Sequence, residues 1–203
     1  MSENEEFDSI LGFWFGKQQD AVRVNAEKSS LWWSKDAKID SEIERRFGSL
    51  VEAAAWGDEL ETWASTPRGT LALVILNDQF PRNIWRGSAQ AFAVDEQAGK
   101  RADGALAAGM DSALRPIERV FLYLPFEHSE SPDDQNRSLA LYRQLAEAAP
   151  VEERELFSGF HDFARRHHEI IDRFGRFPHR NAILGRDSTA KETAFLKQPG
   201  SSF

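Results

Sequence analysis

The chain has no cysteine among its 203 residues. Disulfide bridges, thiolate zinc sites and a cysteine nucleophile are therefore excluded. It also has no excess of positive charge, because 33 acidic residues outnumber 25 lysines and arginines and give a formal net charge of −8. A general nucleic-acid or anionic-membrane binder needs a basic surface, so we expect neither partner.

Long hydrophobic runs are absent as well. The longest, residues 71–76 and 120–126, fall far short of the ~20 residues that a membrane-spanning helix needs. Residues 1–6 are acidic and lack the basic start and apolar centre of a signal peptide. We therefore expect a soluble protein, and the lack of cysteine fits a cytoplasmic location.

Helical patterns dominate what is present. Apolar residues recur every three or four positions from Ile39 to Ala54 and again from Leu156 to Phe174, as on the buried face of a helix. Capping residues followed by proline open further segments after Thr66 and after Ser131. Residues 16–30 lack such a pattern, and we expect them to form the longest loop near the start.

No segment shows the alternation of a half-buried strand with hairpin turns. The apolar runs 71–76 and 120–124 resemble buried strands by periodicity alone, but their proline-capped starts favour buried helices. Two helices that are apolar on all sides imply a central layer covered on both faces. We therefore predict an all-α fold, a stack of antiparallel helix hairpins that forms a single domain over residues 1–203.

A short motif occurs twice, each time after an apolar helical run. Residues 80–83 read Phe-Pro-Arg-Asn, and residues 177–181 read Phe-Pro-His-Arg-Asn. Proline lacks an N–H and disfavours a helical conformation in the residue before it, so each copy is expected to end its helix. A third apolar run, 120–126, ends in Glu127 and His128. Three apolar segments with polar ends predict one convergent polar site.

Acid–base chemistry is expected at the end of the third run. Burial beside an apolar helix raises the pKa of a carboxyl group, which suits Glu127 to act as a general acid or base. Adjacent helical positions point about 100° apart, so Glu127 and His128 should face different partners. We expect His128 or His179 to move a proton, which makes Glu127, His128 and His179 the candidate catalytic residues.

Guanidinium forks and side-chain amides supply the candidate binding groups. Their density around Gly175 and Pro178 favours an anionic ligand, because the protein as a whole is acidic. The candidate ligand-binding residues are Asp78, Arg82, Asn83, Arg86, Arg176, Arg180 and Asn181. His168 and Asp172 have chelate spacing without a second such pair, so no metal is predicted. No cofactor is predicted either, because the chain has no dinucleotide fingerprint or phosphate-binding glycine loop.

The leading prediction is an enzyme or binding protein for a small anionic molecule, and two alternatives stay open. The polar clusters could only tie loops together, for example through an ion pair between Glu127 and a loop arginine. Alternatively, the protein could be a helical scaffold that binds a peptide or protein in a concave groove. Exposed Trp14, Trp32 or Trp33 would favour that groove, although core packing is the simpler role for these rings.

Longer blocks around the same residues resemble a known family. Residues 78–83, 124–130 and 175–181 are similar to signature blocks of the bacterial domain-of-unknown-function family 924, and the similarity runs from about residue 7 to residue 197. The resemblance implies an all-helical, tetratricopeptide-like superhelix, although the Trp-x-x-Leu-Gly-x-x-Tyr opening of that ~34-residue repeat is absent. It implies no activity, because the function of the family is not established. Asn77 is a modest departure, since a leucine is commoner there.

Overall fold

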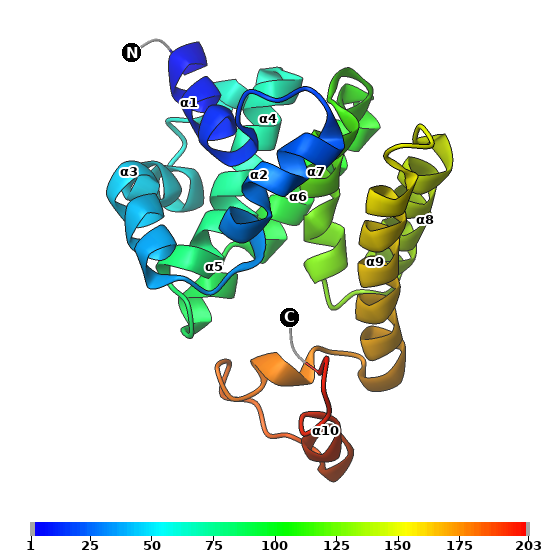
Figure 1. Cartoon of the computed structure of the whole chain (residues 1–203). Coiled ribbons are helices and arrows are strands. Elements are labelled where there is room, and N and C mark those ends of the chain that lie inside the picture. Colours follow the sequence, from blue (N-terminus) through cyan, green and yellow to red (C-terminus); the bar gives the residue numbers. More distant parts are fainter. Residues whose placement is uncertain (1–2, 202–203) are drawn as a thin grey trace.

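The computed structural model describes residues 3–201, and every regular element within them is helical (Figure 1). This confirms the all-α class, whereas the tetratricopeptide-like superhelix and the single domain remain predictions. Five short helical turns join the longer elements: η1 (Glu61–Ser65), η2 (Ile75–Gln79), η3 (Ala89–Phe92), η4 (Met110–Ala113) and η5 (Pro178–Arg180). The α-helices are α1 (Glu3–Phe15), α2 (Ala21–Trp33), α3 (Ala37–Trp56), α4 (Pro67–Val74), α5 (Phe80–Ile84), α6 (Asp95–Ala107), α7 (Pro116–His128), α8 (Pro132–Ala148), α9 (Arg154–Phe174) and α10 (Ala190–Phe195).

The two fully apolar segments form the centre of the protein, as predicted. Residues 69–74 of α4 are buried on every side, and so are most residues of α7 from Ile117 to Glu127. Helices α1 and α6 contact α4, while α8 and α9 contact α7. None of the helices within residues 3–201 has the length and apolar character needed to cross a membrane.

The tryptophans Trp14 and Trp32 belong to this core rather than to an open surface. The Trp14 ring is fully buried and lies 5.4 Å from the ring of Phe80 and 5.6 Å from the ring of Phe121. Trp32 is buried beside them, whereas Trp33 is half exposed. The core-packing interpretation is therefore correct for Trp14 and Trp32.

Residues 21–33 are helical, so the loop predicted over residues 16–30 is wrong for most of its length. Asp20 caps this helix, because its carboxylate accepts a hydrogen bond of 2.8 Å from the backbone N–H of Arg23. Ala21, Val24 and Trp32 bury one side of α2. Polar residues separate these apolar positions, which is why the periodicity of the sequence did not reveal the helix.

The first Phe-Pro motif continues its helical segment, so the prediction that it ends a helix is wrong. The chain stays helical from Pro67 to Ile84, with η2 as a π-helical turn in the middle. Pro81 is the second residue of α5 and follows directly after the π-helical turn. Single π-helical turns inside α-helices are frequent at functional sites.

The second Phe-Pro motif does follow a helix end. Helix α9 stops at Phe174, and Gly175 caps it in the left-handed conformation with a φ of 69°. The chain then leaves the α8–α9 hairpin and forms η5 and α10, drawn below the other helices in Figure 1. A small apolar cluster of Ile170, Ile171 and Phe177 anchors this segment. The second motif is thereby held beneath the ends of the central helices.

Candidate functional site

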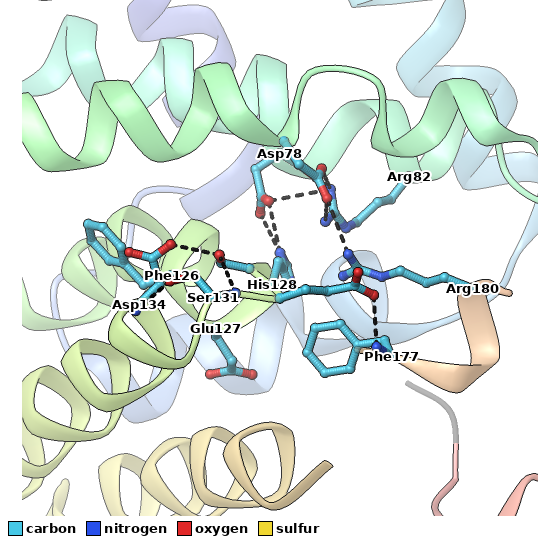
Figure 2. A network of polar contacts seen from close by, with 12 residues as sticks. Asp78, Arg82, Phe126, Glu127, His128, Ser131, Asp134, Phe177 and Arg180 are labelled. Carbon is cyan, nitrogen blue, oxygen red and sulfur yellow. Dashed lines mark hydrogen bonds and ion pairs between the residues drawn. The ribbon is translucent and has the colours of Figure 1, made fainter. Parts of the chain in front are cut away.

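Polar side chains from five separate elements meet where η2, α5 and α7 end (Figure 2). Arg82 lies on α5, Asp95 begins α6, and Arg180 lies on η5. The carboxylate of Asp95 accepts hydrogen bonds of 3.0 and 3.1 Å from Arg82, and the Nη1 of Arg180 lies 3.5 Å from the same carboxylate. The two copies of the Phe-Pro motif therefore lie side by side around one carboxylate.

Asp78 and His128 form a pair at the centre of this network. The Asp78 carboxylate has no exposed surface, and its two oxygens lie 2.8 and 2.9 Å from the Nδ1 of His128. Burial by itself would raise the pKa of Asp78, but the Arg82 guanidinium and the His128 ring outweigh it and hold this pKa well below its usual range. An ionised carboxylate only accepts hydrogen bonds, so Nδ1 carries the ring proton and Nε2 keeps its lone pair.

His128 can accept a proton at Nε2. Burial lowers the pKa of the His128 ring, Asp78 opposes this effect, and Arg82 and Arg180 add to it. The ring is therefore neutral at pH 7, with Nε2 as its basic atom. Asp78 stabilises the protonated ring once it forms, as the carboxylate does in hydrolases that pair a histidine with an aspartate.

A cleft of about 580 Å³ opens beside the pair, a volume within the usual range for small-molecule sites. His128 and Arg180 both line it, together with Asp95 and Glu130. Apolar surface comes from Phe92 and from the end of α7. The cleft is thus lined by both a base and a cation.

Arg180 is a buried cation in this cleft with unused hydrogen-bond donors. Its side chain is only 8% exposed and stacks between two rings, 4.8 Å from the centre of Phe92 and 4.5 Å from the centre of Phe177. Within residues 3–201 the one hydrogen bond of its side chain is the 3.5 Å contact with Asp95, and its buried Nε has no partner. Burial and neighbouring Arg82 lower the pKa of Arg180 to about 10, so the group is charged at neutral pH.

Glu127 has a different environment from its neighbour, as the sequence predicted. Figure 2 shows its side chain pointing away from Asp78 and His128, toward α9. There the Oε1 of Glu127 lies 3.0 Å from the Nδ1 of His167, and both side chains are buried. The partner of Glu127 is thus a histidine on α9, rather than the loop arginine that the structural alternative assumed.

Burial sets the protonation of this second pair. Burial, and secondly the charge of Asp78, raise the pKa of Glu127 to about 8. Burial, with a smaller contribution from His128, lowers the pKa of His167 to about 3. Both groups are therefore neutral at pH 7. Glu127 does not contribute to the described lining of the cleft.

Several candidate residues hold the fold together outside the cleft. Asp40 at the start of α3 accepts a hydrogen bond of 2.8 Å from Asn83 and two of 2.7 Å from Arg86. Arg176 donates to both carboxylate oxygens of Glu192, at 2.7 and 2.9 Å. Each of these two arginines forms an ion pair with one carboxylate. The two pairs connect the end of α5 to α3 and the end of α9 to α10.

Two more candidates belong to the C-terminal segment. The amide of Asn181 donates to the Oγ of Ser188 at 3.1 Å and accepts from the Nε of Arg186 at 3.0 Å, which folds the loop after η5. The ring of His179 lies 5.6 Å from the ring of Phe177, and burial and Arg180 lower the pKa of His179 to about 4. In the described residues, neither side chain lines the cleft.

Glu130 and Arg186 support the site and were not among the candidates. Glu130 accepts hydrogen bonds of 2.7 and 3.0 Å from Arg186 and one of 2.8 Å from the backbone N–H of Phe177. This arrangement holds the second Phe-Pro motif against the end of α7. Glu130 lies within the block 124–130 that resembles the family, so its place in that block was a usable signal.

Gln135 and Asp95 also contribute to the site and were not among the candidate residues predicted from the sequence. The Nε2 of Gln135 donates to the backbone carbonyls of Phe126, Glu127 and Ser129, at 3.3, 2.7 and 2.7 Å. These bonds satisfy the end of α7 and so position His128. Neither residue lies in a distinctive motif. Within residues 3–201 no group of three or more His, Asp or Glu side chains has the geometry to hold a metal ion.

Comparison with known proteins places this arrangement among proteins of unknown function. The model of the bacterial family of unknown function DUF924 matches residues 10–200. A solved structure of a protein of unknown function from Agrobacterium tumefaciens, ATU0120, superposes with a TM-score of 0.80 at 36% sequence identity. The match covers 97% of this chain and 99% of that chain. No curated protein matches.

Proposed function

This chain belongs to DUF924, a bacterial family of unknown function, and we propose that it is an enzyme acting on a small anionic molecule. One observation supports the proposal above others. His128, oriented by the buried carboxylate of Asp78, and Arg180, with unused donors, line the same cleft. A base and a cation that line one cleft are what proton transfer on an anionic substrate requires.

In the proposed mechanism, Arg180 binds the anionic group and the Nε2 of His128 removes a proton. The proton comes from a water molecule in a hydrolysis, or from the substrate in a lyase or isomerase reaction. Asp78 stabilises the imidazolium that results, and Arg82 keeps Asp78 ionised. Of the three candidate catalytic residues, His128 has this role because it is the one that lines the described cleft.

A thermal-shift screen tests the binding step. We expect small carboxylates, sulfates or phosphates to raise the melting temperature of the wild type, because ligands that bind only the native state stabilise it by ~2.7 kcal/mol at a hundredfold excess over Kd. Arg180→Gln should abolish the shift. Arg86→Gln is the matched control, since Arg86 is paired with Asp40 outside the described lining of the cleft. No shift with any anion, or an equal shift in Arg180→Gln, would refute the proposal.

Turnover of a ligand found in that screen tests the catalytic step. His128→Asn keeps an N–H donor toward Asp78 and removes the basic nitrogen. We expect the variant to bind the ligand and to lose ~10²–10⁴-fold in kcat, as followed by mass spectrometry of the product. Unchanged kcat would remove His128 from the mechanism and leave a binding protein.

The scaffold alternative receives less support. A peptide groove was expected to expose Trp14, Trp32 or Trp33, but Trp14 and Trp32 lie in the core and Trp33 alone is half exposed. We therefore favour the small ligand, and we propose that the protein acts in the cytoplasm.

A further inference from the structure

The charge around the cleft restricts which anion fits it. Its described lining contains more carboxylates than fixed cations, so an added multiply charged anion would meet net repulsion. The lining carboxylates are Asp95, Glu96, Asp103, Glu130 and Asp134, and the lining cations are Lys100, Arg137 and Arg180. A phosphate or polyphosphate ligand is therefore disfavoured, whereas a single carboxylate can use the spare donors of Arg180.

One of these carboxylates has no cationic partner. The other four form ion pairs with neighbouring lysine or arginine side chains. Asp134 has none within residues 3–201, and its Oδ2 accepts a hydrogen bond of 2.6 Å from the Oγ of Ser129. Among the described residues, the cleft thus contains a cation with unused donors and a carboxylate without a cationic partner.

These two groups flank the proposed base. Figure 2 shows Asp134 and Arg180 on opposite sides of His128, and all three line the cleft. We propose that the ligand is a small zwitterion whose carboxylate binds Arg180 and whose protonated amino group binds Asp134. This inference rests on the proposed function and adds the substrate class. Such a ligand brings no net charge, and each of its ends forms a charge-assisted hydrogen bond.

Matched ligand sets test the substrate class with the whole protein. The zwitterions are glycine, β-alanine and γ-aminobutyrate, which span a range of lengths. Acetate, propionate and butyrate lack the amino group, methylamine, ethylamine and propylamine lack the carboxylate, and glycerol phosphate is the dianion. We expect at least one zwitterion to bind about tenfold more tightly than both of its matched partners and than glycerol phosphate, as measured by thermal shift and calorimetry.

A variant identifies the group that binds the amine. In Asp134→Asn, the ratio of the affinities for a zwitterion and its matched carboxylate should fall to about one. Asp103→Asn, which removes a carboxylate already paired with Arg137, should keep the wild-type ratio. Asp134 lies in the first turn of α8, so Asp134→Asn can lower stability, but the ratio is taken within each protein and is not affected.

The outcomes separate this inference from the proposed function. If carboxylates without an amino group, or glycerol phosphate, bind the wild type as tightly as the zwitterions, the zwitterion class is wrong and the anion site stands. If the ratio is unchanged in Asp134→Asn, Asp134 does not bind the amine and the inference is also wrong. If no zwitterion, carboxylate or phosphate binds, the proposed function fails as well.

Discussion

Glu127→Gln should make the protein increasingly more stable than the wild type as the pH rises. The wild-type carboxyl is buried against His167, a neutral partner, so its ionised form has no compensating cation there. Glutamine has nearly the same shape and never ionises. The variant therefore separates the effect of charge at this position from the effect of packing.

The magnitude follows from the pKa of Glu127. Burial and the charge of Asp78 raise this pKa from 4.5 to about 8, so between these pH values the native state binds the proton that the unfolded state has lost. The free energy of unfolding of the wild type consequently falls by about 1.4 kcal/mol per pH unit from this group, or by about 5 kcal/mol in total. The stability that the protonated Glu127 carboxyl contributes is fully present below about pH 4.5 and is lost by about pH 8.

Urea denaturation at pH values from 5 to 9 measures this difference. We expect the two proteins to agree within about 1 kcal/mol near pH 5, and the variant to be more stable by about 4 kcal/mol near pH 8. Groups distant from Glu127 titrate alike in both proteins and cancel in the comparison. Glu130→Gln is the control, because hydrogen bonds from Arg186 and Phe177 lower the pKa of Glu130 despite its burial. The difference in the free energy of unfolding between Glu130→Gln and the wild type should be constant above about pH 6.

Two results would contradict this reasoning. Parallel stability curves for wild type and Glu127→Gln would mean that Glu127 titrates alike in the native and unfolded states. A loss of about 3–5 kcal/mol at every pH would mean that the native protein holds an ionised Glu127 in a buried ion pair, which is the structural alternative.

Asp78→Asn should destabilise the fold by about 3–5 kcal/mol in urea denaturation, because it removes the buried carboxylate from a charged network. The same variant should lower the pKa of His128 further, which NMR titration of the ring measures, since Asp78 is the main group that raises it. Gly69→Ala should lower the melting temperature, because its Cβ would lie 2.2 Å from the backbone oxygen of Trp63. Gly12→Ala should raise the melting temperature, because glycine inside a helix costs about 1 kcal/mol relative to alanine. The added Cβ would meet no atom within 4 Å.

Local interactions account for what the sequence predicted well. The cap at Thr66 accepts a hydrogen bond from Gly69, three residues away, and Gly175 ends α9 through its own backbone conformation. Thr189 and Glu192 form a capping box at the start of α10. Each of these features depends on residues within one helical turn, so their spacing in the sequence is sufficient to identify them.

The sequence-based predictions were incomplete or wrong for features that depend on packing. Helix α2 shows only a weak apolar pattern, and its burial comes from aromatic rings elsewhere in the core, such as Trp14 and Phe121. The π-helical turn at residues 75–79 lets the helical segment continue through Pro81, where the proline rule predicted an end. A wider turn has no sequence signal of its own, because it is selected by the packing around it.

Periodicity and capping act over a few residues, so they were sufficient to predict the all-α class, the two apolar central helices and the polar clusters at their ends. The role of each charged group, in contrast, depends on its surroundings in the folded protein. Arg86 and Arg176 are neutralised by Asp40 and Glu192, which lie 46 and 16 positions away, whereas Arg180 keeps unused donors in the cleft. The free energy of a charged side chain depends on its partners and burial in space, and sequence spacing does not specify either.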